Sequence, residues 1–367
     1  MLKTLIIAAS ILVSSAAVAE DTELPFKVTP VATFNEPWAM TFMPDGKMLV
    51  TEKRGRLYIV TQDGEVGPYF DEVPNVDYRG QGGLGDVIVH PEFEKNQLVY
   101  LSYAESGMGN TRGAAVARGR IQVPDRGRPY LTDVEVIWRQ IPKMTDDGHY
   151  GHRMAFDKDG YLFISSGDRQ KFDPAQHMTG TVGKIVRLHD DGSVPDDNPF
   201  AEDGDITEQI WSIGHRNPLG LAFDAKGRLW NTEMGPLHGD ELNLVKAGKN
   251  YGYPIVSNGD HYSGEPIPDH DTRPEFEAPK VSWTPTIAPA ELIFYSGNMF
   301  PELKGSALIA GLASRAIIRV EVDGESAREV ERFKFDNRIR EIEQGPDGSL
   351  WVLEDKDGGR LLQLTRK

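Results

Sequence analysis

The residues best suited to chemistry in this sequence are concentrated in one segment, residues 211–254. Arg216 and Asn217 stand side by side, and a guanidinium fork next to an amide can hold a planar, anionic, oxygen-rich ligand. Gly235 and Pro236 end the same apolar unit, and their backbone carbonyls are the hard oxygen ligands that calcium prefers. An anion clamp and a cation site on one unit predict a negatively charged cofactor together with a metal ion.

The loop that follows Pro236 is acidic and rich in oxygen donors. Glu241 and the backbone around Tyr251 add a carboxylate and carbonyl groups to it. Their spacing does not match an EF-hand, so calcium is inferred here from ligand chemistry and not from a motif. An ordinary acidic loop is the alternative that the composition leaves open.

Two histidines three positions apart, His149 and His152, open the third apolar unit. A histidine at the start of an innermost strand can act as a general base, because its unperturbed pKa is near neutrality. No carboxylate completes an HExxH-like metal site. Asp168 ends the same unit and is suited to orient an imidazole through a ring N–H, with a turn-closing aspartate as the alternative. From the residues alone, each histidine is a candidate base or an ordinary loop residue.

Two further segments carry groups suited to an anionic ligand. Residues 79–85, RGQGGLG, place Gln81 as a neutral donor in a glycine-rich turn, but the turn precedes a strand, unlike a phosphate loop. Arg338 and Arg340 are two positions apart, so in a strand both guanidiniums share one face and repel unless an anion lies between them. Arg315 in the fifth unit is a third candidate cation, with a surface position as the alternative.

These groups are placed by a repeated pattern: an apolar stretch, a turn rich in Pro, Asp and Gly, and a second apolar stretch. Each unit predicts a β-hairpin, and a spacing of roughly forty to seventy residues is typical of four-stranded blades with long loops. The pattern occurs in residues 38–60, 82–104, 152–169, 218–235, 291–324 and 339–366.

The repeats predict an all-β fold, a six-bladed β-propeller with four-stranded antiparallel blades, as a single domain over residues 20–367. Two stacked β-sandwiches would give no reason for the recurring pattern. Residues 25–34 are expected to add a strand to the last blade and close the ring. No long amphipathic helix is expected, and the chemistry should lie in loops around one end of the central channel.

The leader and the overall composition restrict where the protein works and what it binds. Residues 1–19 combine Lys3, an apolar run and a small-residue triplet, which predicts a signal peptide cleaved after Ala19 and a periplasmic protein. The sequence has no cysteine, which excludes disulfides and thiolate chemistry. The formal charge of −16 becomes −17 once the +1 of Lys3 is removed, which argues against nucleic acid and anionic lipid as partners. No other segment is apolar enough for membrane insertion.

Five segments resemble one known family, in order along the chain: QGGLGDVIVHP, GHYGHRMAFDKDGYLFISSGDR, GHRNPLGLAFD, EMGPLHGDELNLVKAGKNYGYP and NRIREIEQGPDGSLWVLED. They are similar to the soluble, pyrroloquinoline-quinone-dependent (PQQ-dependent) aldose sugar dehydrogenases of the glucose/sorbosone dehydrogenase group, over essentially the whole mature chain. The resemblance implies a six-bladed propeller in the periplasm that uses PQQ and calcium. It also implies oxidation of the C1 hydroxyl of an aldose to a lactone, with hydride passing to the quinone.

The resemblance further implies roles for individual residues. His149 would take the proton from the sugar hydroxyl, with Asp168 in support. The cofactor contacts would be Gln81, Arg216, Asn217, Thr286, Arg315, Arg338 and Arg340. The substrate contacts would be Gln81 and Tyr262. Gly235 and Pro236 would bind a calcium at the quinone, and Glu241 and Tyr251 a second, structural calcium.

Two departures from the family pattern leave questions open. The fifth unit has no basic residue where the family often has Lys, so Arg315 is expected to substitute from one or two positions away. His152 stands where the family usually has Gly, so two histidines compete for the role of base, and alignment on Arg153 favours His149.

Other propeller functions are not excluded by the residues. A calcium-dependent lactonase and a binding propeller without cofactor are the alternatives to a dehydrogenase. For a dehydrogenase, the expected partners are an aldose and a separate electron acceptor, since no haem motif is present. Both a monomer and a homodimer are compatible with the sequence.

Overall fold

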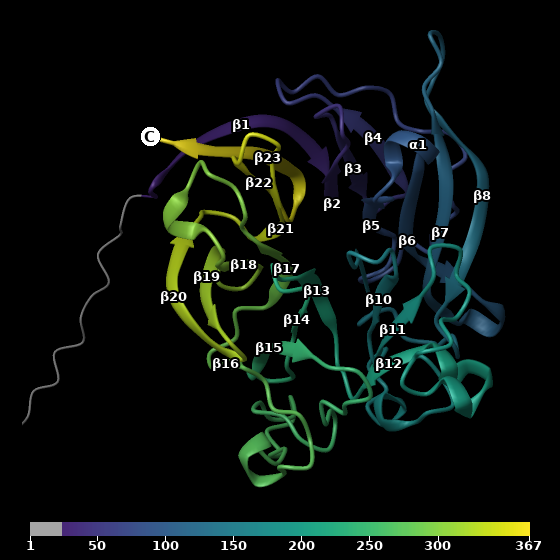
Figure 1. Cartoon of the computed structure of the whole chain (residues 1–367), viewed down its shortest axis with the longest axis vertical. Coiled ribbons are helices and arrows are strands. Elements are labelled where there is room, and N and C mark those ends of the chain that lie inside the picture. The colour runs from purple at the N-terminus through teal and green to yellow at the C-terminus, as the bar shows by residue number, and fades with distance from the viewer. Residues whose placement is uncertain (1–23) are drawn as a thin grey trace, which may run out of the picture.

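The computed structural model describes residues 24–367, so the predicted leader, residues 1–19, lies outside the described residues. Within the described part the strands form six antiparallel sheets arranged in a ring (Figure 1). One edge strand of each sheet contacts the corresponding strand of the next sheet, so that β2, β5, β9, β13, β17 and β21 surround the central channel. The predicted all-β six-bladed propeller is confirmed.

The two inner strands of each blade form the hairpins that the repeats predicted. They are β2 (Pro37–Phe42) with β3 (Met48–Glu52), β5 (Leu84–Val89) with β6 (Leu98–Ser106), β9 (Gly151–Phe156) with β10 (Leu162–Ser166), β13 (Pro218–Phe223) with β14 (Leu229–Glu233), β17 (Pro289–Phe294) with β18 (Ala307–Gly311), and β21 (Ile339–Gln344) with β22 (Leu350–Glu354). Four of these turns use a glycine in the left-handed region, which suits a residue without a Cβ: Gly46, Gly160, Gly227 and Gly348.

The outer strands complete five of the six blades. They are β7 (Arg112–Gln122) and β8 (Tyr130–Arg139), β11 (Lys184–Leu188) and β12 (Ile210–Ile213), β15 (Asp240–Val245) and β16 (Val281–Trp283), β19 (Ala316–Asp323) and β20 (Ser326–Lys334), and β23 (Asp357–Arg366) with β1 (Phe26–Asn35). Strand β1 pairs antiparallel with β23, from Phe26 opposite Arg366 to Asn35 opposite Asp357. The expected closure of the ring by the N-terminal strand is confirmed, and Figure 1 shows the two strands side by side.

The expectation of four strands per blade is wrong for the first blade, which has β2, β3 and β4 (Arg56–Val60) only. The chain does return along β4: the Gly67 N–H donates to the Ile59 carbonyl at 3.0 Å and the Phe70 N–H to the Leu57 carbonyl at 2.9 Å. Pro68 lies between these two donors and has no N–H of its own, so a regular ladder cannot form.

Helices are short in the part of the chain that the structure describes, as expected. The only α-helix found there is α1 (Phe93–Asn96). Single 3₁₀ turns interrupt the loops: η1 (Met108–Asn110), η2 (Asp173–Gln176), η3 (Ala201–Asp203), η4 (Asp205–Gln209), η5 (His270–Thr272) and η6 (Pro301–Leu303). No helix within residues 24–367 is long and apolar enough to cross a membrane.

The core lies between the blades. Six clusters of buried apolar side chains fill the space between neighbouring sheets around the ring. Trp230, between the fourth and fifth blades, and Trp351, between the sixth and first, are fully buried. Because every blade has an apolar neighbour on both sides, the ring is held by burial of apolar surface without disulfides.

One buried ion cluster joins four blades on the channel axis. The Nη1 atom of Arg153 in β9 lies 3.1 Å from Asp86, 2.6 Å from Glu291 and 2.8 Å from Glu341, which belong to β5, β17 and β21. Burial raises the pKa of Glu291 to about 7 despite the neighbouring guanidinium. The cluster therefore has more carboxyl groups than its one cation can neutralise, and it depends on Arg153.

Candidate active site

A cavity of about 250 Å³ lies where the inner strands begin, and all six blades line it. Its walls include Trp38 and Lys53 from the first blade, Gln81 before the second, His152 from the third, Asn217 before the fourth, Leu312 after β18 of the fifth, and Arg338 and Arg340 at the sixth. A cavity shared by every blade is on the axis of the propeller, where such folds place ligands. The structure thus brings together four of the predicted cofactor contacts: Gln81, Asn217, Arg338 and Arg340.

His149 lies next to this cavity and is paired with Asp168. Its Nδ1 is 2.7 Å from Asp168 Oδ1, and the carboxylate is fully buried. The backbone fixes both partners: the His149 N–H donates to Gln81 Oε1 at 2.8 Å, and the Asp168 N–H donates to the Arg216 carbonyl at 2.7 Å. With Asp168 accepting from Nδ1, the second ring nitrogen, Nε2, is left without a partner among residues 24–367.

The electrostatic surroundings keep His149 neutral. Burial lowers the pKa of His149, and the hydrogen bond to Asp168 opposes this effect without overcoming it. The nearby Arg216 lowers the pKa further. A neutral imidazole with a free Nε2 and an oriented Nδ1–H is the form that a general base requires at neutral pH.

His152 occupies a different setting, although it is only three residues away. Its Nδ1 is 2.7 Å from Ser102 Oγ, and its ring stacks on Trp38 with centroids 5.0 Å apart. Burial lowers the pKa of His152 to about 3. No carboxylate orients this ring, so the arrangement of a supported base belongs to His149.

Arg338 and Arg340 already share a counter-ion, which the sequence analysis missed. Asp355, just after β22, lies 2.8 Å from Arg338 Nε and 2.7 Å from Arg340 Nη2. Burial acts to raise the pKa of Asp355, but the two guanidiniums outweigh it and bring the pKa to about 2. One negative charge between two positive ones leaves a net positive wall. The signal was present, since Asp355 follows the strand that pairs with the one starting at Ile339.

Arg216 and Asn217 hold the side of the site nearest to His149. Arg216 donates to the Met234 carbonyl at 3.0 Å and to the Tyr262 hydroxyl at 3.4 Å, while its Nε is buried without a partner in the described chain. The Asn217 side-chain oxygen accepts from the Gly151 N–H at 3.2 Å. Tyr262 is 73% exposed and does not line the axial cavity, so this predicted substrate contact lies on the surface beside Arg216.

Gly235 and Pro236 fit the cation expected at this site. Both residues are buried, and their carbonyl oxygens accept no hydrogen bond from any described residue. The Gly235 N–H donates to Asp240 Oδ1 at 2.9 Å, which fixes the turn. Within residues 24–367 no three His, Cys, Asp or Glu side chains are grouped to hold a metal. Unpartnered, buried carbonyl oxygens are hard ligands of the kind calcium takes.

The proposed second calcium site is supported at Glu241 and not at the side chain of Tyr251. The Tyr251 hydroxyl donates to the Leu244 carbonyl at 2.5 Å and accepts from the Lys246 N–H at 2.9 Å, so both of its functions are used. Its ring stacks on His215 with centroids 4.7 Å apart. A carbonyl oxygen is what Tyr251 has left to offer a cation.

Glu241 lies in a buried, oxygen-rich cluster on one face of the fourth blade. It stands opposite Glu233 across β14 and β15, and Asn231 stands opposite Asn243 in the same register. Burial raises the pKa of both glutamates, to about 7 for Glu233. The side-chain oxygens of Asn231 and Asn243 are buried without partners in the described residues. These oxygens fit a cation or an ordered water.

Three predicted cofactor contacts are not part of the cavity wall: Thr286, Arg315 and Arg216, which lies beside Asn217. The Thr286 hydroxyl donates to Asp240 Oδ2, and exposed Arg315 points one guanidinium nitrogen at the Asp336 carbonyl, 3.4 Å away. The fifth blade presents Leu312 to the cavity instead. A lysine that the sequence analysis did not single out, Lys53 of the first blade, lines it, with Nζ 3.3 Å from the Gly80 carbonyl.

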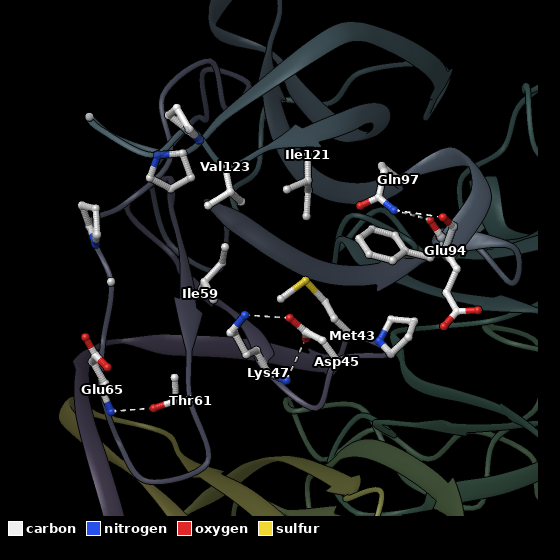
Figure 2. A pocket seen from close by; sticks show the side chains of 17 residues that line it. Met43, Asp45, Lys47, Ile59, Thr61, Glu65, Glu94, Gln97, Ile121 and Val123 are labelled. Carbon is white, nitrogen blue, oxygen red and sulfur yellow. Dashed lines mark hydrogen bonds and ion pairs between the residues drawn. The ribbon is translucent and has the colours of Figure 1, made fainter.

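A larger hollow of about 780 Å³ lies at the opposite ends of β2 and β3, between the first and second blades (Figure 2). Figure 2 shows its apolar side chains, such as Met43 and Ile121, with polar groups that contact one another, such as Asp45 with Lys47. It coincides with the irregular edge of the three-stranded blade. Only two blades line it, and its ion pair is exposed, so it does not compete with the axial cavity as a reaction site.

A six-bladed propeller with a cationic axial cavity and a carboxylate-supported histidine has the features expected of an oxidoreductase of the propeller type. Comparison with known proteins supplies the family: residues 34–363 match the model described as Glucose / Sorbosone dehydrogenase. The chain belongs to this family, which includes aldose and glucose sugar dehydrogenases.

Individual relatives agree with this assignment. Aldose sugar dehydrogenase YliI of Escherichia coli is 37% identical over 337 residues, covering 90% of each chain. The solved apo-form of the soluble aldose sugar dehydrogenase from Escherichia coli superimposes with a TM-score of 0.87, at 36% identity over 93% of this chain and 100% of that one. The PQQ-bound form of aldose sugar dehydrogenase from Streptomyces coelicolor gives 0.74, at 26% identity over 94% and 99%.

Proposed function

We propose that this protein oxidises the C1 hydroxyl of aldose sugars to lactones with PQQ as its cofactor. The observation that carries the proposal is the His149–Asp168 pair beside a cavity walled by Arg338 and Arg340. PQQ is a planar, oxygen-rich tricarboxylate, and when bound it supplies an electrophilic quinone that accepts hydride from the sugar. A relative of known structure holds this cofactor.

The chain's own residues divide the work of holding the cofactor. Arg338 and Arg340 present a net positive wall, because Asp355 neutralises one of their two charges. Gln81 and Asn217 offer amide groups on the neighbouring walls, and their N–H donors suit the oxygens of the ligand; Asn217 Nδ2 otherwise has only a long contact of 3.9 Å to Met234 Sδ. The Gly235 and Pro236 carbonyls would hold a calcium ion, which would supply Lewis-acid polarisation of the bound quinone.

His149 performs the proton transfer. Its neutral Nε2 takes the proton from the C1 hydroxyl as the C1 hydrogen leaves as hydride, so the sugar loses two protons and two electrons in total and becomes the lactone. Asp168 holds the ring through Nδ1 and stabilises the imidazolium that forms. Tyr262, whose hydroxyl accepts a hydrogen bond from Arg216, would contact the sugar.

The setting of the reaction follows from the sequence. The predicted signal peptide, residues 1–19, supports export to the periplasm. A separate electron acceptor would reoxidise the cofactor, and a second calcium at Glu241 would be structural.

Reconstitution tests the function directly. The purified protein is incubated with PQQ and calcium, and reduction of an artificial dye is followed after adding glucose or another aldose. We expect dye reduction that requires PQQ, calcium and aldose together. Hydrolysis of a sugar lactone without PQQ would instead favour a lactonase, and absence of both PQQ binding and dye reduction would refute the dehydrogenase.

A further inference from the structure

His152 lines the axial cavity, yet the proposed reaction gives it no task. Its side chain is 2% exposed and stacks on Trp38, with the two ring planes 19° apart. Trp38 also lines the cavity, and it is backed by Arg153, whose guanidinium carbon lies 4.2 Å from the Trp38 ring centroid. The cavity thus has an aromatic pair in its wall, supported from behind by a buried cation.

The hydrogen bonds of His152 determine which ring nitrogen carries the proton. Ser102 Oγ accepts from the Asp86 N–H at 2.8 Å and lies 2.7 Å from His152 Nδ1. The Ser102 hydroxyl hydrogen has no other acceptor in the described chain, so it is donated to Nδ1. In the neutral ring the proton is then on Nε2, and Nε2 has no hydrogen-bond partner among residues 24–367.

The fold makes room for this ring. A Cβ on Gly85 in β5 would lie 1.9 Å from His152 Cε1, so only glycine at position 85 allows the imidazole to occupy its place. Three features therefore coincide at one buried side chain in a ligand cavity: an aromatic stack, a fixed tautomer and an unpartnered N–H donor. Because His152 lines the axial cavity, a ligand there can accept from this donor.

We propose that His152 is a direct contact of the quinone cofactor, with Nε2–H as a donor to its oxygens and the stack on Trp38 fixing the orientation of the imidazole. A neutral N–H donor held in one orientation suits an oxygen-rich ligand. This inference rests on the proposed function, because it assigns a further contact to the same cofactor.

Equilibrium binding of PQQ to the calcium-loaded protein, without sugar, tests the contact. His152→Leu removes the N–H donor, and we expect it to raise the Kd for PQQ about tenfold. His152→Gln keeps a neutral N–H donor and is expected to recover most of the lost affinity. His189→Leu, a histidine outside the cavity, serves as the matched control and should bind like the wild type.

The possible outcomes distinguish failure of the His152 contact from failure of the proposed function. If the wild-type protein does not bind PQQ, the proposed function fails. If it binds, and folded His152→Leu has the wild-type Kd, only the contact is overturned. If His152→Leu does not fold, Ser102→Ala decides, because it frees Nδ1 while His152 stays; we expect a Kd about threefold higher, and an unchanged Kd overturns the contact.

Discussion

Replacing His149 by Gln separates proton transfer from cofactor binding. Gln preserves a polar side chain of similar size but cannot take a proton at neutral pH. The backbone of residue 149 stays anchored through its N–H to Gln81, and Asp168 stays anchored through the Arg216 carbonyl. His149 is not part of the cavity wall, so the wall itself is unchanged.

The expected loss is in kcat. A positioned general base contributes about 10²–10⁴-fold to the rate, which corresponds to about 3–5 kcal/mol of transition-state stabilisation. We therefore expect kcat of His149→Gln to fall at least ~100-fold at saturating aldose and PQQ, with the Kd for PQQ within about threefold of the wild type. Dye-reduction kinetics and PQQ titration of the same protein samples measure the two quantities.

The pH dependence gives a second check on the same pair. Because the pKa of His149 is below its usual value, kcat/KM should fall on the acid side only below about pH 6.5. Asp168 acts to raise that pKa, so Asp168→Asn should shift the acid limb to lower pH while reducing the rate. The assignment is refuted if His149→Gln keeps more than a tenth of kcat, or if Asp168→Asn moves the limb upward.

Three further predictions concern the rest of the ring. Lys53→Gln should raise the Kd for PQQ about fivefold, whereas Lys53→Arg and Arg315→Gln should keep a Kd close to that of the wild type. If a PQQ titration shows a higher Kd for Arg315→Gln and an unchanged one for Lys53→Gln, Arg315 is the contact instead. Arg153→Met should lower the free energy of unfolding by about 3–5 kcal/mol in urea, since buried carboxyl groups lose their cation; a loss below about 1 kcal/mol contradicts the axial cluster. In the folded protein the pKa of Glu291 is raised from its usual 4.5 to about 7. The protonated side chain therefore stabilises the fold fully below pH 4.5, and this contribution is lost as the pH rises through 7. Thermal denaturation of Glu291→Gln should thus show less decline from pH 6 to 8 than the wild type, and an equal decline is the contrary result.

The fold could be predicted because hairpin signals recur along the chain. The turns at Gly46, Gly160, Gly227 and Gly348 mark strand pairs locally, and six pairs define the ring. The missing strand of the first blade also has a local cause, the proline at position 68, which a closer reading of residues 66–70 would have found.

The site could be predicted only in part, because its geometry depends on contacts between blades. The directions of the His149 and His152 side chains do not follow the alternation of a regular strand, because both residues have a positive φ, 50° and 62°. Asp355 follows the second strand of a hairpin, and placing it beside Arg338 and Arg340 requires the register of the two strands. Lys53 comes from the first blade, whereas a basic residue was expected in the fifth.

The pairing of β1 with β23 gives the molecule a seam formed by its two ends. Strands from the start and the end of the chain must meet before the last sheet is whole, so a chain still being made, or one cut short before residue 357, cannot close. The axial cavity draws on all six blades, although its lining residues, from Trp38 to Arg340, lie outside β1 and β23. Closure of the last sheet therefore supports the cavity from outside, by holding the first and last blades together, and no single blade contains a complete site.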